Sequence, residues 1–267
     1  MLRRCRAVIF DMDDTLVPTS KIDKAAILHA ATKALSSSEA AESTSSHLQF
    51  GPAAAALASR FAELLKAAPF PAPESGQDIP TWRTQLWARA LGDEAASTSL
   101  VLPAARLAHD TWVAQRLDNF RLSDEVQAMI RRLQAAGYAT GVLTNGHTDV
   151  QRAKAAACDA ASVFGEGRVV IAGEYSEQKP HASIFHTACG LLGEAADATV
   201  MVGDSYAADI TGGINAGLLA TVWVRPDDGG AGSMMHDHLS DVPPGKPPPT
   251  YTVGSVLELE AVLEKIG

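Results

Sequence analysis

The pattern of apolar and polar positions divides the chain into two parts with different periodicities. From about residue 122 onwards, segments with apolar residues at helical spacing alternate with short runs that are apolar at almost every position. In 123–137, Ser123 stands at the N-cap position of a predicted helix and Gly137 at its end. Runs that are apolar on both faces are typical of parallel strands covered by helices. We therefore expect an α/β fold with a Rossmann-like parallel sheet. The expected strands are 6–10, 138–143, 168–172, 198–202 and 219–224, and the expected helices after the first are 147–158, 181–192, 207–217 and 253–267.

The part of the chain between the first strand and this alternating region has helical patterns and no convincing strand. Ser-rich residues near 36–46 and Pro-rich residues 69–80 are typical of loops between those helices. The pattern predicts a helical domain of residues 18–118 inserted into a core domain of residues 1–17 and 119–267. The expected helices of the inserted domain are 21–35, 52–68, 81–91 and 103–117.

Composition and charge narrow the classes of protein to consider. The chain has 267 residues, of which 46% are hydrophobic and 20% charged, as in ordinary globular proteins. A formal net charge of −9 disfavours nucleic acid and anionic membranes as partners. No apolar run approaches the roughly 18 residues of a membrane span, and the three cysteines form no disulfide framework. We expect a cytoplasmic protein, as a monomer or homodimer, with no nucleic-acid or membrane partner.

The first predicted strand runs directly into three acids, Asp11, Asp13 and Asp14. Burying a carboxylate is costly unless a metal, a cation or several hydrogen bonds compensate it. Asp11 and Asp13 are two residues apart, and in an extended chain such residues point the same way, so both can face one reacting group. Asp14 is the acid we expect to form hydrogen bonds in the turn after the strand.

Polar residues also stand at three other places along the predicted sheet edge where the carboxyl ends of the strands meet. Ligands bind at that edge in open parallel sheets. Taken singly, each group is also ordinary turn or helix-entry chemistry. Taken together, clustered carboxylates would repel one another unless a divalent cation neutralised them, and hard oxygen ligands favour Mg²⁺. Thr144 and Lys179 are donors that suit a phosphate. The residues concerned are Thr144, Asn145, Gly146, Lys179, Asp204 and Asp209.

Four short stretches, DMDDTL, LTNG, KP and GDSYAAD, together resemble the motifs of the haloacid dehalogenase superfamily, in the same order and on the same elements. The resemblance implies that 18–118 is a helical cap domain. It also implies a Mg²⁺-dependent phosphatase that works through an aspartyl-phosphate. The expected substrate is a small phosphorylated metabolite, a sugar or sugar-acid phosphate, with N-acylneuraminate 9-phosphate as the specific expectation. One departure is His147, which stands where an acidic residue is expected.

The resemblance also implies roles for individual residues. Asp11 would be the nucleophile, and Asp13 would protonate the leaving alcohol and then deprotonate the attacking water. Asp11, the backbone carbonyl of Asp13 and Asp204 would ligate Mg²⁺, with Asp209 as a further ligand or an orienting residue. An acid at position 13 favours phosphoryl transfer over dehalogenation, because halide leaves without a proton. The phosphoryl oxygens would be held by Thr144, Asn145, Gly146 and Lys179.

Several alternatives remain open at the level of sequence. Other sugar phosphates or phosphoglycolate could be the substrate, and a phosphomutase would pass the phosphoryl group on. A phosphonatase would need a cap lysine for a Schiff base, but the lysines there are better explained as solvated. A protein of a different class, a catalytically silent phosphosugar-binding regulator, would keep binding without turnover. We expect Trp82, Trp87 and Trp112 to be core residues of the inserted domain. His109 belongs to the inserted domain, His181 is expected to start its helix, and His236 and His238 are expected to be solvated loop residues and not metal ligands. For His147 two interpretations stay open: contact with substrate or with a cap residue, or a position at a helix start with no catalytic duty.

Overall fold

The structure, a computed structural model, describes residues 4–37, 51–71, 76–92, 101–225 and 241–267. The chain separates into two compact units. Residues 1–20 and 120–267 form one, called the α/β unit below, and residues 21–119 form the other, called the helical unit. His236, His238 and most of the Ser-rich segment lie outside the described residues.

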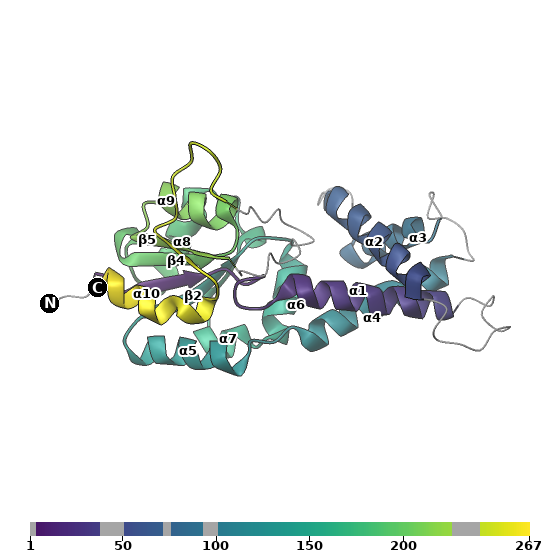
Figure 1. The fold of residues 1–267 in the computed structure, drawn as a ribbon, viewed down its shortest axis with the longest axis horizontal. Coiled ribbons are helices and arrows are strands. Elements are labelled where there is room, and N and C mark those ends of the chain that lie inside the picture. The colour runs from purple at the N-terminus through teal and green to yellow at the C-terminus, as the bar shows by residue number, and fades with distance from the viewer. Residues whose placement is uncertain (1–3, 38–50, 72–75, 93–100, 226–240) are drawn as a thin grey trace. The chain divides into compact units, whose positions relative to one another are not determined.

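The α/β unit is built on a six-stranded parallel sheet with strand order β3-β2-β1-β4-β5-β6 (Figure 1). This confirms the expected α/β fold with a Rossmann-like parallel sheet. All four residues of β1 are buried, as expected of a central strand covered on both faces. The strands are β1 Ala7–Phe10, β2 Ala139–Thr144, β3 Val169–Ile171, β4 Thr199–Gly203, β5 Ala220–Val224 and β6 Tyr251–Val253.

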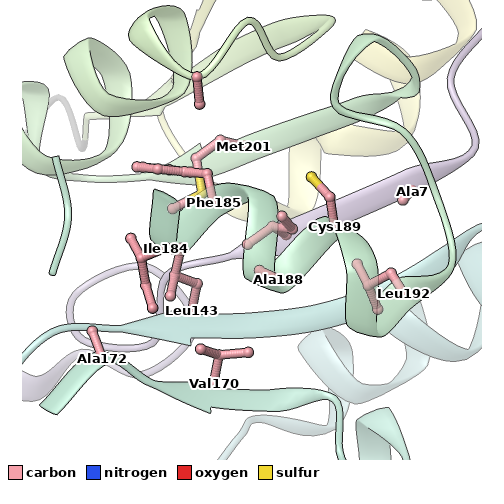
Figure 2. Packing of buried hydrophobic residues seen from close by; sticks show 12 residues of the cluster. Ala7, Leu143, Val170, Ala172, Ile184, Phe185, Ala188, Cys189, Leu192 and Met201 are labelled. Atoms are coloured by element: carbon pink, nitrogen blue, oxygen red, sulfur yellow. The ribbon is translucent and has the colours of Figure 1, made fainter. Parts of the chain in front are cut away.

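Helices cover both faces of this sheet. Ile9 belongs to a buried cluster with Ile184 and Phe185 of α8. Figure 2 labels Ile184 and Phe185 in this cluster, together with Ala7 of β1. Phe10, the neighbour of Ile9, lies instead against Phe164 of α7, with ring centroids 6.0 Å apart. Because successive side chains of a strand point to opposite faces, α8 and α7 cover opposite sides. The α-helices of this unit are α5 Asp124–Ala135, α6 Thr148–Ala157, α7 Ala160–Phe164, α8 Ala182–Leu192, α9 Thr211–Asn215 and α10 Leu259–Ile266.

The ends of the expected α5 helix are confirmed. The Ser123 side chain accepts a hydrogen bond from the backbone N–H of Val126, which satisfies one of the free donors of the first turn. Gly137 follows the helix with a φ of 88°, a conformation that a side chain disfavours.

Three details near the chain's C-terminal half differ from the expectation. The edge strand β6 was not anticipated, because the polar Thr252 stands in its middle and a Pro-rich segment precedes it, whereas the equally short β3 is apolar throughout. The predicted helix 207–217 is a π-helix at Tyr206–Ile210 followed by α9. The predicted helix 253–267 begins later, with a 3₁₀ turn at Val256–Glu258 before α10, since Val253 is still paired in the sheet.

The helical unit contains helices only, within the residues that are described. Its core is aromatic: the Phe61 and Trp87 rings stack with centroids 3.8 Å apart, and Trp112 meets Phe61 edge-on at 5.2 Å. Trp82, Trp87 and Trp112 are all buried, so their expected role as core residues is confirmed. The helices are α1 Thr19–Ser36, whose first two residues belong to the α/β unit, α2 Gly51–Ala67, α3 Ile79–Ala90 and α4 Leu102–Asn119.

Across the described helices of both units, none combines the length and the apolar character needed to cross a membrane.

Candidate active site

The carboxyl ends of β1, β2 and β4 meet at one place in the sheet. Phe10 lies in register with Val142 on one side and Val202 on the other. Asp11 continues this pairing, since its backbone N–H donates to the carbonyl of Val202 at 2.8 Å. The residues that follow the three strands are therefore brought together, as the sequence predicts for an open parallel sheet.

Three carboxylates form a buried cluster at this edge. Asp11, Asp204 and Asp209 each offer one oxygen atom, and these atoms all lie within 4.8 Å of one another. None of the three side chains is exposed beyond a small fraction, and Asp209 is fully buried. Lys179 Nζ lies 2.6 Å from Asp11 Oδ1 and 2.7 Å from Asp209 Oδ1. The geometry thus joins four of the predicted site residues in one network.

The charge of this network is not balanced by the protein's own groups. Burial raises the pKa of Asp11 to about 7, although the Lys179 ammonium acts to lower it. Burial, and then the neighbouring carboxylates Asp11 and Asp209, raise the pKa of Asp204 well above its usual range. Burial acts to lower the pKa of Lys179, but the two carboxylates at its ammonium outweigh that and raise it. One ammonium among three buried carboxylates leaves negative charge, and an oxygen-only donor set of this kind fits a hard divalent cation.

Neighbouring groups from the strands and turns around them hold Asp209 and Asp204 in place. The backbone N–H of Ser205 donates to Asp209 Oδ2 at 3.0 Å. A Cβ atom at Gly203 would overlap the carboxylate of Asp209, so this close approach requires glycine. Thr15 donates its hydroxyl to Asp204 Oδ1 at 3.3 Å, and Trp223 donates to the Asp204 carbonyl at 2.8 Å.

Asp13 lies apart from the acidic cluster, in a separate set of hydrogen bonds. Its side chain receives hydrogen bonds from Lys154 Nζ at 2.7 Å, from Thr19 Oγ1 at 2.7 Å and from Gln151 Nε2 at 2.8 Å. Burial acts to raise the pKa of Asp13, but Lys154 and these hydrogen bonds outweigh it and hold that pKa well below its usual range. Asp13 is therefore ionised at neutral pH in this arrangement. The metal-ligand role expected of its backbone carbonyl stays a prediction.

Gln151 and Lys154 are site residues that the sequence did not single out. Both lie on α6, three residues apart and hence on one helix face, and both are buried. The sequence offered one signal that these two residues lie near the site: their helix begins just after residues 144–146, which are themselves predicted site residues. Polar residues on such a helix are more often solvated, and only the tertiary fold turns these two toward Asp13.

The residues at the end of β2 and just after it contact both the loop of Lys179, which belongs to the acidic cluster, and Gln151, which belongs to the hydrogen-bonded group around Asp13. Asn145 Nδ2 donates to the Lys179 carbonyl at 2.8 Å, and the Lys179 N–H donates back to Asn145 Oδ1 at 3.0 Å. The reciprocal pair fixes the loop that carries the Lys179 ammonium. Gln151 Nε2 also donates to Thr144 Oγ1, at 2.5 Å. Gly146 has a φ of 125°, which a side chain would disfavour.

Asp14 has the turn role expected of it. It has a positive φ of 56°, and its side chain accepts a hydrogen bond from the Ser20 N–H at 2.8 Å. Short-side-chain polar residues tolerate this conformation because they bond the local backbone. The expectation of hydrogen bonding in the turn is confirmed.

Three of the five histidines named above lie in the described residues. Two of them directly precede helices of the α/β unit, and the third lies in the helical unit. His147 precedes α6, and its Nδ1 accepts a hydrogen bond from the Asp149 N–H at 3.3 Å. His181 stands at the equivalent position before α8 without a side-chain capping bond. His109 is buried on α4 and pairs with Asp110 at 2.9 Å.

The sequence of the chain matches known protein families and known proteins. A family described as haloacid dehalogenase-like hydrolase matches residues 5–217, and a second hydrolase-like family of the same group matches residues 177–259. N-acylneuraminate-9-phosphatases from Rattus norvegicus and Homo sapiens are each 34% identical to the chain, over 99% of it and 96% of their own length. A glyceraldehyde 3-phosphate phosphatase from Pyrococcus furiosus is 26% identical over 84% of the chain and 82% of its own length.

Solved structures agree on the fold. A Bacillus subtilis protein described as a HAD-hydrolase, in a structure with bound magnesium, superposes with a TM-score of 0.62 at 22% identity. The match covers 97% of this chain and 99% of that one. The chain therefore belongs to the haloacid dehalogenase-like hydrolases and is a phosphoric monoester hydrolase of that family.

Proposed function

We propose that this enzyme is a Mg²⁺-dependent phosphatase that hydrolyses N-acylneuraminate 9-phosphate through an aspartyl-phosphate on Asp11. The observation that carries the proposal is the buried cluster of Asp11, Asp204 and Asp209 with the Lys179 ammonium between two of the carboxylates. Phosphomonoesters resist hydrolysis so strongly that a nucleophile, a metal and a cation acting together are chemically reasonable.

In the first step of the proposed mechanism, the ionised carboxylate of Asp11 attacks phosphorus. The bond from phosphorus to the sugar oxygen breaks, and Asp13 gives its proton to that oxygen. Lys154 holds Asp13 ionised in this arrangement, so Asp13 must carry a proton taken from solvent, or from the water consumed in the previous turnover, before this step, and the leaving oxygen then replaces Lys154 at its carboxyl group. Mg²⁺, held by Asp11, Asp204, Asp209 and the carbonyl of Asp13, would supply charge neutralisation at the phosphoryl oxygens.

In the second step, a water molecule attacks phosphorus and breaks its bond to Asp11. Asp13, now ionised, accepts the proton of that water, and inorganic phosphate and free Asp11 result. The phosphoryl oxygens would be held by the Lys179 ammonium, the Thr144 hydroxyl and the backbone N–H groups of Asn145 and Gly146. Lys179 and Thr144 are both buried, so their donors are held with little freedom.

We further propose that the helical unit acts as the cap domain and selects the substrate. The resemblance to the curated N-acylneuraminate-9-phosphatases extends over 99% of the chain, the helical unit included, and this supports their substrate over shorter phosphate esters. Glyceraldehyde 3-phosphate, other sugar phosphates and phosphoglycolate are the substrates to compare. A cytoplasmic location is likewise proposed, supported by three buried cysteines, none of which is in a disulfide.

The test is phosphate release from a panel of phosphorylated sugars, sugar acids and small organic acids, with and without Mg²⁺. We expect the highest kcat/KM for N-acylneuraminate 9-phosphate and no turnover after chelation. Asp11→Asn removes the nucleophile and should abolish turnover. Asp14→Asn is the matched control, because Asp14 stands in the same turn, bonds only locally and can be replaced by a residue that tolerates its φ.

Two results would contradict the proposal. Unchanged turnover by Asp11→Asn would remove Asp11 as the nucleophile. Tight phosphosugar binding by the native chain with no phosphate release from any ester, an aryl phosphate included, would favour the catalytically silent regulator.

A further inference from the structure

The side chain of Gln151 contacts two residues that have different proposed roles in the reaction. Gln151 belongs to α6, and only 2% of it is exposed. Its Nε2 atom donates to Thr144 Oγ1 at 2.5 Å and to Asp13 Oδ2 at 2.8 Å. All three residues lie in the α/β unit. One amide group therefore connects a residue proposed to hold the phosphoryl oxygens with the proposed acid and base.

The chemistry of the amide fixes the direction of both hydrogen bonds. An amide oxygen beside the Asp13 carboxylate would be repelled by it, so the group that faces Asp13 is the NH2 of Gln151. This nitrogen donates two hydrogens and accepts none. The Thr144 hydroxyl is therefore the acceptor of its bond with Gln151, and the hydroxyl hydrogen must point in another direction.

The hydrogen of the Thr144 hydroxyl is thereby left for a ligand. Within the described part of the chain, the acceptor that it has is the carbonyl of Asn145 at 3.5 Å, a distance at which a hydrogen bond is weak. A negatively charged phosphoryl oxygen is a stronger acceptor than a carbonyl. Without the bond from Gln151, the hydroxyl would be free to rotate away from such an oxygen.

Gln151 also holds the Asp13 carboxylate and packs against the loop after β2. Lys154 and Thr19 donate to Oδ1 of Asp13. Gln151 donates to the other oxygen, Oδ2, so both oxygens of this carboxylate are held. A Cβ atom at Gly146 would lie 3.3 Å from Cγ of Gln151, which places the glutamine side chain directly against the Gly146 backbone.

We propose that Gln151 is a positioning residue that directs the Thr144 hydroxyl and the Asp13 carboxylate toward one phosphoryl group. This inference rests on the proposed function. Gln151 itself touches no reacting atom; it acts by fixing the hydrogen of one group and the orientation of the other. Because the two groups must act together in the transition state, the loss of Gln151 affects kcat more than KM.

The experiment removes the Gln151 donor and measures whether the effect depends on the Thr144 hydroxyl. Gln151→Met keeps the length of the side chain without a donor, and Gln151→Leu is a second variant of this kind. Thr144→Val removes the hydroxyl at nearly constant size, and the double variant Gln151→Met/Thr144→Val completes the cycle. Assays at saturating Mg²⁺ give kcat and KM for p-nitrophenyl phosphate and for the best ester of the panel, and thermal unfolding gives Tm.

Gln134→Met is the matched control. Gln134 belongs to α5, and its Nε2 atom donates to Thr140 Oγ1 and to the Val163 carbonyl, both at 2.9 Å. It makes the same kind of double contact with a threonine of β2, but near the amino end of the strand and not at its carboxyl end. Its loss should reduce stability without an effect on the reaction.

We expect Gln151→Met and Gln151→Leu to lower kcat by about 10- to 100-fold, with KM within about threefold of the native value. Gln134→Met should lower Tm by a similar amount and keep the native kcat. In the Thr144→Val enzyme, the loss caused by Gln151→Met should be at least about fivefold smaller than in the native enzyme, because the hydroxyl that Gln151 directs is already absent.

Native kcat in both Gln151 variants would overturn the inference. So would losses that simply multiply in the double variant, since Gln151 would then not act through Thr144. Gln151 variants that lose far more Tm than Gln134→Met, together with all turnover, would show a purely structural glutamine and would also overturn it. Failure of the proposed function is distinguishable, because the native enzyme would then release no phosphate or Asp11→Asn would keep native turnover.

Discussion

The raised pKa of Asp11 makes the stability of the metal-free enzyme depend on pH in a direction opposite to that of most carboxylates. In the unfolded chain this carboxyl returns to its ordinary value of 3.8, whereas in the folded protein burial raises its pKa to about 7. Between these values the folded state holds a proton that the unfolded state has lost. Stability is therefore greatest at the low end of this range and falls as pH rises through 7.

The size of this effect follows from the two pKa values of Asp11. A difference of this size corresponds to a loss of about 3 kcal/mol in the free energy of unfolding between about pH 5 and about pH 8. Asp204 acts in the same direction, because its pKa is also raised. Asp13 does not contribute to this loss. Its pKa is lowered in the folded protein, so its stabilising effect is lost only as pH falls below 3.8. His109, whose pKa burial lowers, acts in the opposite direction near pH 6.5.

Urea denaturation at several pH values, in EDTA and in excess Mg²⁺, measures the effect. In EDTA the native enzyme should lose stability from pH 5 to pH 8. With Mg²⁺ the loss should disappear, because a bound cation stabilises the ionised carboxylates. Asp11→Asn is the comparison that isolates Asp11: its EDTA curve should show a clearly smaller fall, and the part that remains is due to Asp204. A native enzyme whose stability in EDTA stays level or rises across this range would refute the reasoning.

Three further perturbations test other parts of the structure. Lys154→Met removes the cation that keeps the proposed acid/base carboxylate of Asp13 ionised, so the alkaline limb of the pH–kcat/KM profile, where Asp13 loses the proton it must give, should move up by about one unit or more, while exposed Arg152→Met leaves it in place. Gly203→Ala should displace the Asp209 carboxylate and raise the Mg²⁺ concentration for half-maximal activity by about tenfold or more, measured by Mg²⁺ titration. Trp87→Ala should cost about 3–5 kcal/mol in the free energy of unfolding, measured by urea denaturation, because this fully buried ring is stacked in the core.

The sheet was predictable from the sequence wherever a strand was long and apolar on both faces. β1, β2, β4 and β5 all meet that condition, and the helices between them show a clear helical period. β6 was missed because the polar Thr252 interrupts its short apolar run, and its place at the sheet edge depends on pairing with β5. The helix α7 was missed because its five residues, Ala160–Phe164, are too few to show a helical period.

The acids of the site were also predictable, because parallel strands bring their carboxyl ends together whatever their spacing in the sequence. Asp11 and Asp204 follow two neighbouring strands, so their proximity is a matter of topology. Lys154 and Gln151 were not predictable in this way. A polar or charged residue on a helix is usually solvated, and only the packing of other elements shows that these two are buried.

The strand order has a consequence for how the enzyme is made. β1 is followed along the chain by the helical unit, while its two partners in the sheet, β2 and β4, begin only at Ala139 and Thr199. During synthesis on a ribosome, β1 therefore has no strand to pair with until well over a hundred further residues have been added. The helical unit consists of contiguous residues and can assemble in that interval. Asp11, the proposed nucleophile, is thus synthesised well before the strands and loops that complete its surroundings.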